Sequence, residues 1–269
     1  MSHELASLLL SETLQYSVNI AKKQVYALFL DAKSAFDRTT KEILIRNLFF
    51  AGTDDQRLLY LNNRLGNRNT YCEFDKIMMG PIHDTRGLEQ GGISSSDQYK
   101  IYNNEQADVA HSSLLGVPIL NLTISCISLA DDTVLLSNHL YNLENLLFLT
   151  KKYCSKYDVV LVPEKTKLVS FHKKDSDDAI YERATSNISL HSCELPFSSK
   201  AEHLGIIRTE DLSNMEYVLD RLSAHRKHLF SVFPQEWLFT IQAIQQPQLE
   251  LKECIAYLCS YLAWPPFLS

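Results

Sequence analysis

The chain has 269 residues, of which 45% are hydrophobic and 22% are charged, and its formal net charge at pH 7 is −6. That length can bury a substantial core in one large domain or two modest ones, and the composition excludes fibrous and low-complexity classes. The acidic balance gives no indication of a nucleic-acid partner, because phosphate binding favours clustered Lys and Arg.

The cysteines and the apolar stretches indicate where the protein resides. Six cysteines are scattered without Cys-x-x-Cys units, so a zinc site is not expected. The N-terminus lacks the basic-then-apolar pattern of a signal peptide. The most apolar stretches, Leu114–Ala130 and Ile255–Leu268, are interrupted by polar residues or proline. We therefore expect a soluble intracellular protein without a membrane partner, in either the nucleus or the cytoplasm.

The first half of the chain predicts helices around one buried strand. Apolar spacing indicates a helix over Glu4–Lys23, and the unbroken apolar run Val25–Asp31 is typical of a strand buried on both faces. Thr39 or Thr40 is expected to cap a helix that runs to about Phe50. The following elements are a helix over Thr53–Leu65, strands over Tyr71–Phe74 and Ile77–Ile82, and a helix that Ser94–Ser96 can cap and that ends near His111.

The second half predicts a hairpin, a helix and several short strands. Two apolar strands, Ile119–Leu129 and Val134–Ser137, flank the acidic turn, and Asn142–Lys156 has the spacing of an amphipathic helix. This order predicts an α+β fold with helices on one face of a mainly antiparallel sheet. The remaining elements are strands over Val159–Val162, Leu168–Phe171, Ile188–Leu190 and His203–Ile207, a polar loop over Lys173–Asp178, and a basic helix over Ser213–Phe230.

Three segments place polar residues where apolar elements end. Asp31 ends the buried strand, Gly87–Gly92 is a glycine-rich turn, and Asp131 and Asp132 lie at the hairpin tip. We expect the three carboxylates to converge at one sheet edge. Two Mg²⁺ ions held there could activate a hydroxyl for attack on phosphorus and stabilise the leaving pyrophosphate. Each segment alone also has a plainer interpretation, as turn chemistry or as a helix cap.

Together, however, these segments resemble the motif series of reverse transcriptases, in that family's order. Phe-x-Asp-x-x-x-Ala-Phe-Asp resembles the first catalytic motif, Gly-x-x-Gln-Gly-x-x-x-Ser the next, and Ala-Asp-Asp the third. Downstream, Glu164-Lys165-Thr166-Lys167 resembles the fourth motif, and His203-Leu204-Gly205-Ile206 resembles the primer-grip hairpin. The sequence around Gln90 is similar to that of LINE-type, non-LTR retrotransposons rather than to that of retroviral enzymes.

The resemblance implies roles for the acidic residues and for one aromatic residue. Asp31 and Asp131 would hold two Mg²⁺ ions, with Asp132 assisting. Phe36 would pack against the sugar of the incoming nucleotide and exclude a 2′-hydroxyl. Asp37 would cap the next helix or orient Arg38 rather than bind metal.

Further residues of the later motifs would contact the substrates. Gln90 and Gly91 would lie along the nucleotide and template, where a side chain at position 91 would block close approach. Lys165 would donate a proton to the leaving pyrophosphate, although Lys167 competes for that role. The plainer interpretation of both lysines is a solvated strand end.

The resemblance also predicts a domain organisation, with some departures from the family. Residues 1–210 would form a reverse transcriptase palm with truncated, residual fingers, and residues 211–269 a thumb-like helical remnant that diverges after about Phe233. Leu129 stands where the family usually has Tyr or Phe. Only 30 residues precede Asp31, so we expect a fragment of a longer element.

These observations favour one function and leave two others open. The favoured one is an RNA-directed DNA polymerase domain of a retrotransposon, acting on an RNA template, a DNA primer and deoxynucleoside triphosphates. The second is a catalytically silent, nucleic-acid-binding remnant of such an element. The third is another two-metal phosphoryl enzyme, such as a nuclease or a nucleotide cyclase, which would not need the Gln90-Gly91 turn.

Overall fold

The computed structural model describes residues 3–66, 68–89, 91–92, 94–172 and 188–213. They belong to the first of two compact units, Met1–Asn214, whereas the second unit, Met215–Ser269, lies outside the described residues. The loop expected over Lys173–Asp178 and, apart from its first residue, the helix expected over Ser213–Phe230 also lie outside them.

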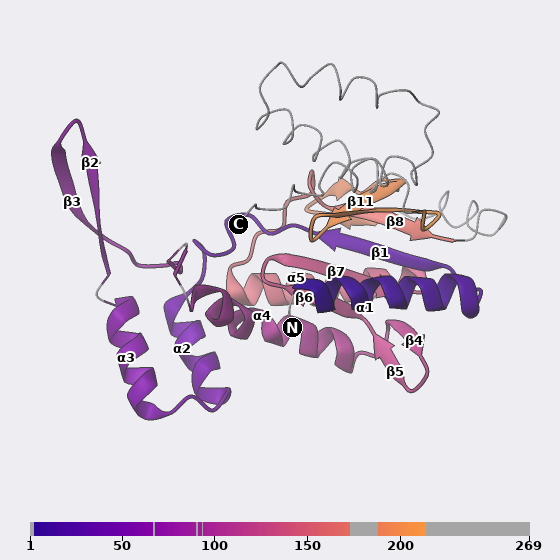
Figure 1. The fold of residues 1–269 in the computed structure, drawn as a ribbon, viewed down its shortest axis with the longest axis horizontal. Helices are drawn as coiled ribbons and strands as arrows, with labels where there is room; N and C mark the ends of the chain where they lie inside the picture. Colours follow the sequence, from indigo (N-terminus) through magenta and orange to yellow (C-terminus); the bar gives the residue numbers. More distant parts are fainter. Residues whose placement is uncertain (1–2, 67, 90, 93, 173–187, 214–269) are drawn as a thin grey trace, which may run out of the picture. The chain divides into compact units, whose positions relative to one another are not determined.

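A four-stranded antiparallel sheet with the order β6-β7-β1-β8 forms the centre of the described unit (Figure 1). Its inner strand β1, Val25–Leu30, pairs with β7, Asp132–Ser137, on one side and with β8, Lys167–Phe171, on the other. Strand β6, Cys126–Leu129, completes the sheet beside β7. All six residues of β1 are buried, as its unbroken apolar run predicted.

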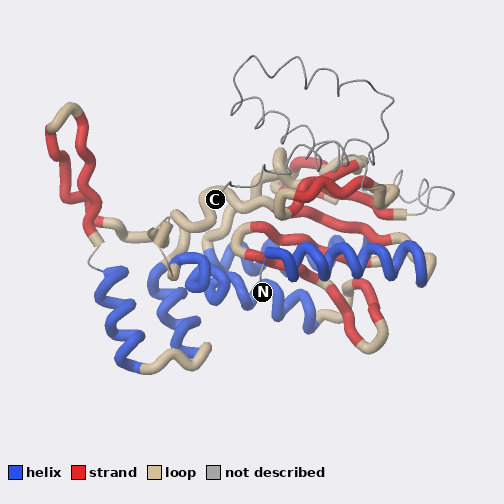
Figure 2. The backbone as a smooth tube through the Cα atoms, viewed as in Figure 1, coloured by secondary structure: helices blue, strands red, loops and turns tan. Residues whose placement is uncertain are grey.

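Successive side chains of β1 point to opposite faces of the sheet and therefore enter two different hydrophobic clusters. Tyr26, Leu28 and Leu30 belong to a cluster shared with α4, Ser95–Ser112, and α5, Leu140–Tyr157. The residues that alternate with them belong to the second cluster, which lies on the other face. Figure 2 shows these helices in blue against the strands in red.

The second cluster is closed by the N-terminal helix and by a late hairpin. Helix α1, His3–Gln15, continues as a π-helical turn, Tyr16–Ile20, and contributes Ala6, Leu10 and Leu14 to the cluster. The hairpin consists of β11, Lys200–His203, and β12, Ile206–Thr209. The sequence pattern predicted one strand here, and the resemblance to the primer grip implied the hairpin.

Between β1 and α4 the chain forms two helices and a separate hairpin. Helices α2, Lys41–Phe50, and α3, Asp55–Gly66, precede the hairpin of β2, Asn69–Phe74, and β3, Ile77–His83. Both hairpin strands are exposed along their whole length. The base of the hairpin is anchored by polar contacts: the Lys41 ammonium donates to the carbonyl oxygens of Leu65 and Asp84, and Arg68 pairs with the Asp84 carboxylate at 2.7 Å.

The strand expected over Ile119–Leu129 is wrong in its boundaries. The chain instead forms a small hairpin of β4, Val117–Ile119, and β5, Leu122–Ile124, before β6 begins. Leu120 adopts a positive φ of 51° at the turn, and Ile119 pairs with Leu122. An apolar leucine in this left-handed conformation gives no turn signal in a sequence, because such positions usually carry Gly or Asn.

The strand expected over Val159–Val162 is also wrong. Within this segment Leu161 forms one isolated bridge with Ala32, and the chain then turns at Pro163. Proline has no N–H to donate to a ladder, so the segment does not continue as a strand. Two further short strands of the described residues are β9, Ser189–Leu190, and β10, Cys193–Glu194, which pair with each other before β11 begins.

The mixed α+β class with a mainly antiparallel sheet is confirmed. The helices cover both faces of the sheet rather than one, because α1 packs on the face opposite α4 and α5. No helix within the described ranges combines the length and the apolar character needed to span a bilayer.

A cluster of buried tyrosines joins α4 to α5 beneath the sheet. Tyr99 and Tyr102 on α4 and Tyr153 and Tyr157 on α5 are all buried, and the rings of Tyr153 and Tyr157 stack at 4.4 Å. The Tyr102 hydroxyl donates to the carbonyl oxygen of Tyr157 at 2.6 Å and accepts from the N–H of Thr40 at 3.4 Å. Burial raises the pKa of this hydroxyl. One side chain thus connects the start of α2 with the end of α5.

We predict that Tyr102→Phe lowers the free energy of unfolding by about 1–3 kcal/mol, because the Tyr157 carbonyl then lacks its buried donor. The matched control is Tyr141→Phe, since Tyr141 is 73% exposed, and it should change stability by less than about 0.5 kcal/mol. Urea unfolding of both variants measures the difference. Equal stabilities would show that the Tyr102 hydroxyl contributes nothing to the packing of α2, α4 and α5.

Candidate active site

The strand register brings the three acidic positions to one end of the sheet. Asp31 follows β1 directly, and the last residue of β1, Leu30, lies opposite Thr133. On the neighbouring hairpin Leu129 pairs with Asp132, which leaves Asp131 in the two-residue turn. The backbone therefore places Asp31 beside the hairpin tip that carries both other aspartates.

The side chains of Asp31 and Asp131 lie in different surroundings. The Asp31 carboxylate lies 3.4 Å from the ammonium of Lys165. Asp131 is exposed and lines a small cavity together with Leu30 and Tyr99. Within the described part of the chain, no three His, Cys, Asp or Glu side chains are gathered closely enough to hold a metal ion. The donor set itself suits a hard divalent cation, because all three groups are carboxylates.

The hairpin tip is held from below by a buried asparagine. Asn103 on α4 donates from Nδ2 to the Ser128 hydroxyl at 2.8 Å and to the carbonyl oxygen of Ala130 at 3.1 Å. Ser128 in turn lies 3.1 Å from the hydroxyl of Thr133. Ala130 has a φ of 55°, a conformation that costs an alanine about 1–2 kcal/mol. Asn103 thus supports a strained turn next to the aspartates.

The sequence interpretation missed Asn103, although a signal was available. Tyr99, Asn103 and Gln106 are spaced at 4 and 3 residues and form one buried face of α4. A polar residue on such a face requires a hydrogen-bond partner, so a specific contact could have been expected there. Leu129, which stands where the family usually has an aromatic residue, packs against the second hydrophobic cluster.

Phe36 lies between the strand end and the glycine-rich turn. Its ring is half-buried and stacks on Tyr99 with 4.8 Å between ring centroids. Its carbonyl oxygen accepts from the N–H of Leu88 at 2.8 Å, and the N–H of Gly87 donates to Thr39 at the same distance. Two main-chain hydrogen bonds therefore dock the glycine-rich turn on the segment that follows β1.

Gly87 is required at this joint for two reasons. Its φ is 86°, and a Cβ atom built on it would lie 2.9 Å from the carbonyl oxygen of Asp37. Gly91 also has a positive φ, of 82°, but no heavy atom lies within 4 Å of its Cβ position. At Gly91 the surrounding space is open, so its conformation, rather than crowding by the protein, favours glycine. Gln90 lies outside the described residues.

A turn after α5 positions Lys165. The N–H of Val162 donates to the carbonyl oxygen of Asp31 at 3.0 Å, and the N–H groups of Lys165 and Thr166 both donate to the carbonyl of Val162. This turn brings the Lys165 ammonium to the Asp31 carboxylate. Lys167 starts β8, where its backbone is paired with Phe29.

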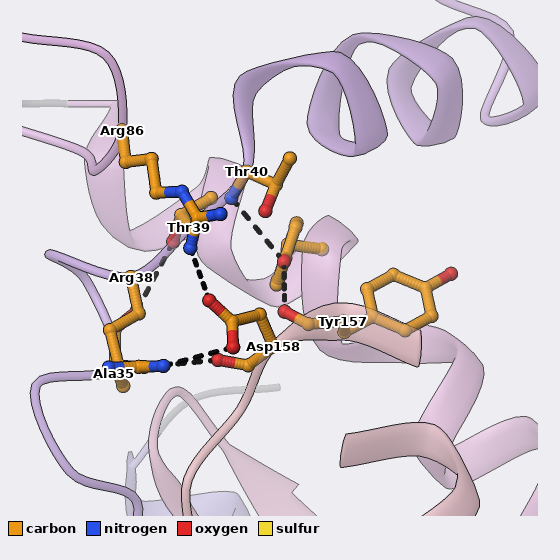
Figure 3. A network of polar contacts seen from close by, with 8 residues as sticks. Ala35, Arg38, Thr39, Thr40, Arg86, Tyr157 and Asp158 are labelled. Carbon is orange, nitrogen blue, oxygen red and sulfur yellow. Dashed lines mark hydrogen bonds and ion pairs between the residues drawn. The ribbon is translucent and has the colours of Figure 1, made fainter. Parts of the chain in front are cut away.

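Asp158 joins the site through two arginines (Figure 3). Arg38 donates from Nη2 to Asp158 Oδ1 at 2.9 Å and from Nε to the Asp158 carbonyl oxygen at 3.1 Å. Arg86 pairs with the other carboxylate oxygen, Oδ2. The hydrogen bond from Arg38, followed by that from Arg86, holds the pKa of Asp158 below its usual value. Asp158, which the sequence interpretation did not single out, thus contributes to orienting Arg38.

We predict that Gly87→Ala destabilises the protein more than Gly52→Ala does. Both glycines have nearly the same φ, 86° and 84°, but only Gly87 has an atom near its Cβ position. The left-handed backbone costs either alanine about 1–2 kcal/mol. At position 87 the collision with Asp37 should add about 1–3 kcal/mol. Urea unfolding measures both losses, and losses of equal size would mean that the docked joint tolerates a methyl group.

Comparisons with known proteins give a family match. A family model described as reverse transcriptase (RNA-dependent DNA polymerase) matches residues 3–207. A search of curated proteins gives no significant match.

Telomerase structures are among the solved structures that match the chain. Apo telomerase from Candida tropicalis matches with a TM-score of 0.53 and 13% identity, covering 79% of this chain and 36% of that one. Its form truncated from the C-terminal domain matches with a TM-score of 0.45 and 15% identity, covering 79% of this chain and 39% of that one. Telomerase from Candida albicans in complex with a TWJ fragment of telomeric RNA matches with a TM-score of 0.47 and 14% identity, covering 79% of this chain and 33% of that one. The chain thus spans between a third and two fifths of the length of these structures.

The family model covers most of the chain, including the strand end, the glycine-rich turn and the acidic hairpin described above. The chain therefore belongs to the reverse transcriptase family of RNA-dependent DNA polymerases.

Proposed function

We propose that the chain is the polymerase domain of a LINE-type, non-LTR retrotransposon, which adds deoxynucleotides to a DNA primer on an RNA template. Family membership supports polymerase chemistry, and the sequence around Gln90 supports the LINE-type subclass. The observation that carries the proposal is the register that sets Asp31 beside the tip bearing Asp131 and Asp132. Reverse transcriptases use divalent metal ions, and this edge offers only hard oxygen donors.

Asp31 and Asp131, with Asp132 assisting, would hold two Mg²⁺ ions. When bound, the ions would supply charge neutralisation and would lower the pKa of the attacking primer hydroxyl. The carboxylates contribute donors whose backbone is fixed by the β1–β7 ladder and by the Asn103 contact. Positioning of this kind supplies most of the rate acceleration in phosphoryl transfer.

Lys165 would serve as the proton donor to the leaving pyrophosphate. Its ammonium already lies at the Asp31 carboxylate, on a turn that is hydrogen-bonded to the Asp31 backbone. It is 66% exposed, so the ammonium can reach an incoming phosphate without displacing core residues. Lys167 remains the alternative donor.

Phe36 would select deoxyribose, and Gly91 would admit the nucleotide and template. The stacking of Phe36 on Tyr99 fixes the ring at the joint between the strand end and the glycine-rich turn. A sugar lying on that ring would have no room for a 2′-hydroxyl. The open space around Gly91 supports close approach by a substrate. Residues 1–210 would form the palm with residual fingers, and residues 211–269 a thumb-like part.

A catalytically silent, nucleic-acid-binding remnant is the second candidate. It is favoured by two observations: the described residues hold no gathered group of three potential metal ligands, and Asp31 is paired with a lysine. In this alternative the palm persists as a scaffold that binds duplex without extending it.

Primer extension on an RNA template with Mg²⁺ separates the two candidates. If the chain is a polymerase, Asp131→Asn should lower the extension rate by about two orders of magnitude or more, equivalent to about 2.7 kcal/mol of transition-state stabilisation. Asp75→Asn, in the exposed turn of the β2–β3 hairpin, is the matched control and should keep the wild-type rate. Duplex binding without Asp131-dependent extension would support the remnant and would refute the polymerase.

We further predict that Phe36→Ala raises the ratio of ribonucleotide to deoxynucleotide incorporation by about tenfold or more, because the steric block to the 2′-hydroxyl is removed. Phe148→Ala, on the exposed side of α5, controls for the loss of an aromatic ring and should leave the ratio unchanged. Single-nucleotide incorporation assays measure both ratios. An unchanged ratio in Phe36→Ala would assign Phe36 to the hydrophobic core alone.

A further inference from the structure

Asp158 ends helix α5, and the hydrogen bond that closes the last helical turn is made by its backbone N–H rather than by its side chain. It is the C-cap of α5, with a φ of 55°, and its N–H donates to the carbonyl oxygen of Cys154. Glycine is the usual residue in this left-handed conformation, because it adopts it without strain. Glycine would close the last turn of the helix equally well. The presence of an aspartate therefore requires another explanation.

The carboxylate of Asp158 binds two arginines from two different segments of the site (Figure 3). Arg38 follows Phe36 closely in the chain, and Arg86 immediately precedes Gly87. Each arginine uses its own carboxylate oxygen, and Arg38 also donates to the Asp158 carbonyl. One side chain thus connects α5 with the strand-end segment and with the glycine-rich turn.

The same two segments are joined directly by the hydrogen bonds from Gly87 to Thr39 and from Leu88 to Phe36. Arg38 and Arg86 bring two positive charges to this joint, and like charges at short range repel. The Asp158 carboxylate lies between the guanidinium groups and compensates for that repulsion. The side chains of Arg38, Arg86 and Asp158 are 36%, 55% and 42% exposed, so each ion pair by itself contributes little to global stability. The effect of the two ion pairs should therefore fall on the local geometry of the joint.

We propose that Asp158 is a positioning residue for the incoming nucleotide. By holding Arg38 and Arg86 together, it fixes the distance between the turn that carries Phe36 and the loop that carries Gly91. It acts through the two arginines and does not itself touch the substrate. This inference rests on the proposed polymerase function. It explains how the spacing between the two segments that would contact the nucleotide is maintained.

Steady-state kinetics of deoxynucleotide addition test the proposal. Asp158→Asn and Asp158→Gly should raise the KM for the deoxynucleotide by between about tenfold and a hundredfold, with a much smaller change in kcat. Asp158→Gly removes the carboxylate but keeps the left-handed cap. Asp75→Gly is the matched control, because Asp75 also has a positive φ, of 49°, and lies in the exposed hairpin turn. An unchanged KM in Asp158→Gly would reduce Asp158 to a helix cap and overturn the proposal.

The double variant Asp158→Asn with Arg86→Gln identifies the cause. If repulsion between the guanidinium groups opens the joint, Arg86→Gln should bring the raised KM of Asp158→Asn most of the way back to the wild-type value. The effects of the two substitutions on KM will then not be additive. Additive effects would show that Asp158 does not act through Arg86 and would contradict the proposal.

Amide hydrogen exchange at Gly87 and Leu88 supplies a readout that is independent of catalysis. Both Asp158 variants should exchange these two amides faster than the wild type, whereas Asp75→Gly should not. If the wild-type protein fails to extend a primer but the Asp158 variants still exchange these amides faster than it does, the polymerase proposal fails and the role of Asp158 in docking stands. If exchange at both amides is unchanged, the positioning role is refuted whatever the chain catalyses.

Discussion

The register of β1 between its two antiparallel neighbours is the constraint on which the site depends. One set of alternate β1 side chains packs against α4 and α5, and the other set packs against α1. A slip by one residue would exchange the two sets between the faces, at the cost of both hydrophobic clusters. The same slip would move Asp31 away from the acidic hairpin. Core packing therefore determines where the first carboxylate of the site lies.

The remainder of the site is assembled on this strand end largely by main-chain contacts and buried polar side chains. The glycine-rich turn is joined by two backbone hydrogen bonds, and a glycine makes the close approach possible. Asn103 and Tyr102, both on α4, reach in different directions to the hairpin tip and to the start of α2. Helix α4 thus connects the segments that the β1–β7 ladder alone does not hold.

The elements that the sequence predicted well are those with a clear helical periodicity or an unbroken apolar run. The apolar run at β1, the α2 and α3 helices and the helical spacing of α5 all lie close to their expected positions. The failures at Ile119–Leu129 and Val159–Val162 have local causes: a leucine in a left-handed turn, and a proline after a short apolar run. Apolar composition alone could not reveal either of them, because both segments look like buried strands.

The candidate site was predictable only in part, for a similar reason. The acidic motifs and Phe36 could be found because the resemblance marks them within short stretches of sequence. The spacing of Asn103 on a buried helical face indicated that it has a polar partner, but neither that partner nor the role of Asp158 could be read from the sequence, since the residues they bind lie far away in the chain and become neighbours only through the fold. The roles of Asp31, Asp131, Asp132 and Lys165, and the LINE-type subclass, remain predictions.

The strained turn at Ala130 also bears on the order in which the protein folds. An alanine in this conformation does not favour the turn by itself, and the compensating contact comes from Asn103 on a separate helix. A peptide containing only the β6–β7 hairpin should therefore populate the turn poorly. During synthesis α4 leaves the ribosome before the hairpin does, because chains emerge from the N-terminus. The helix is then already available as a template when the acidic tip appears, and the edge that carries the aspartates should be among the last parts of the sheet to close.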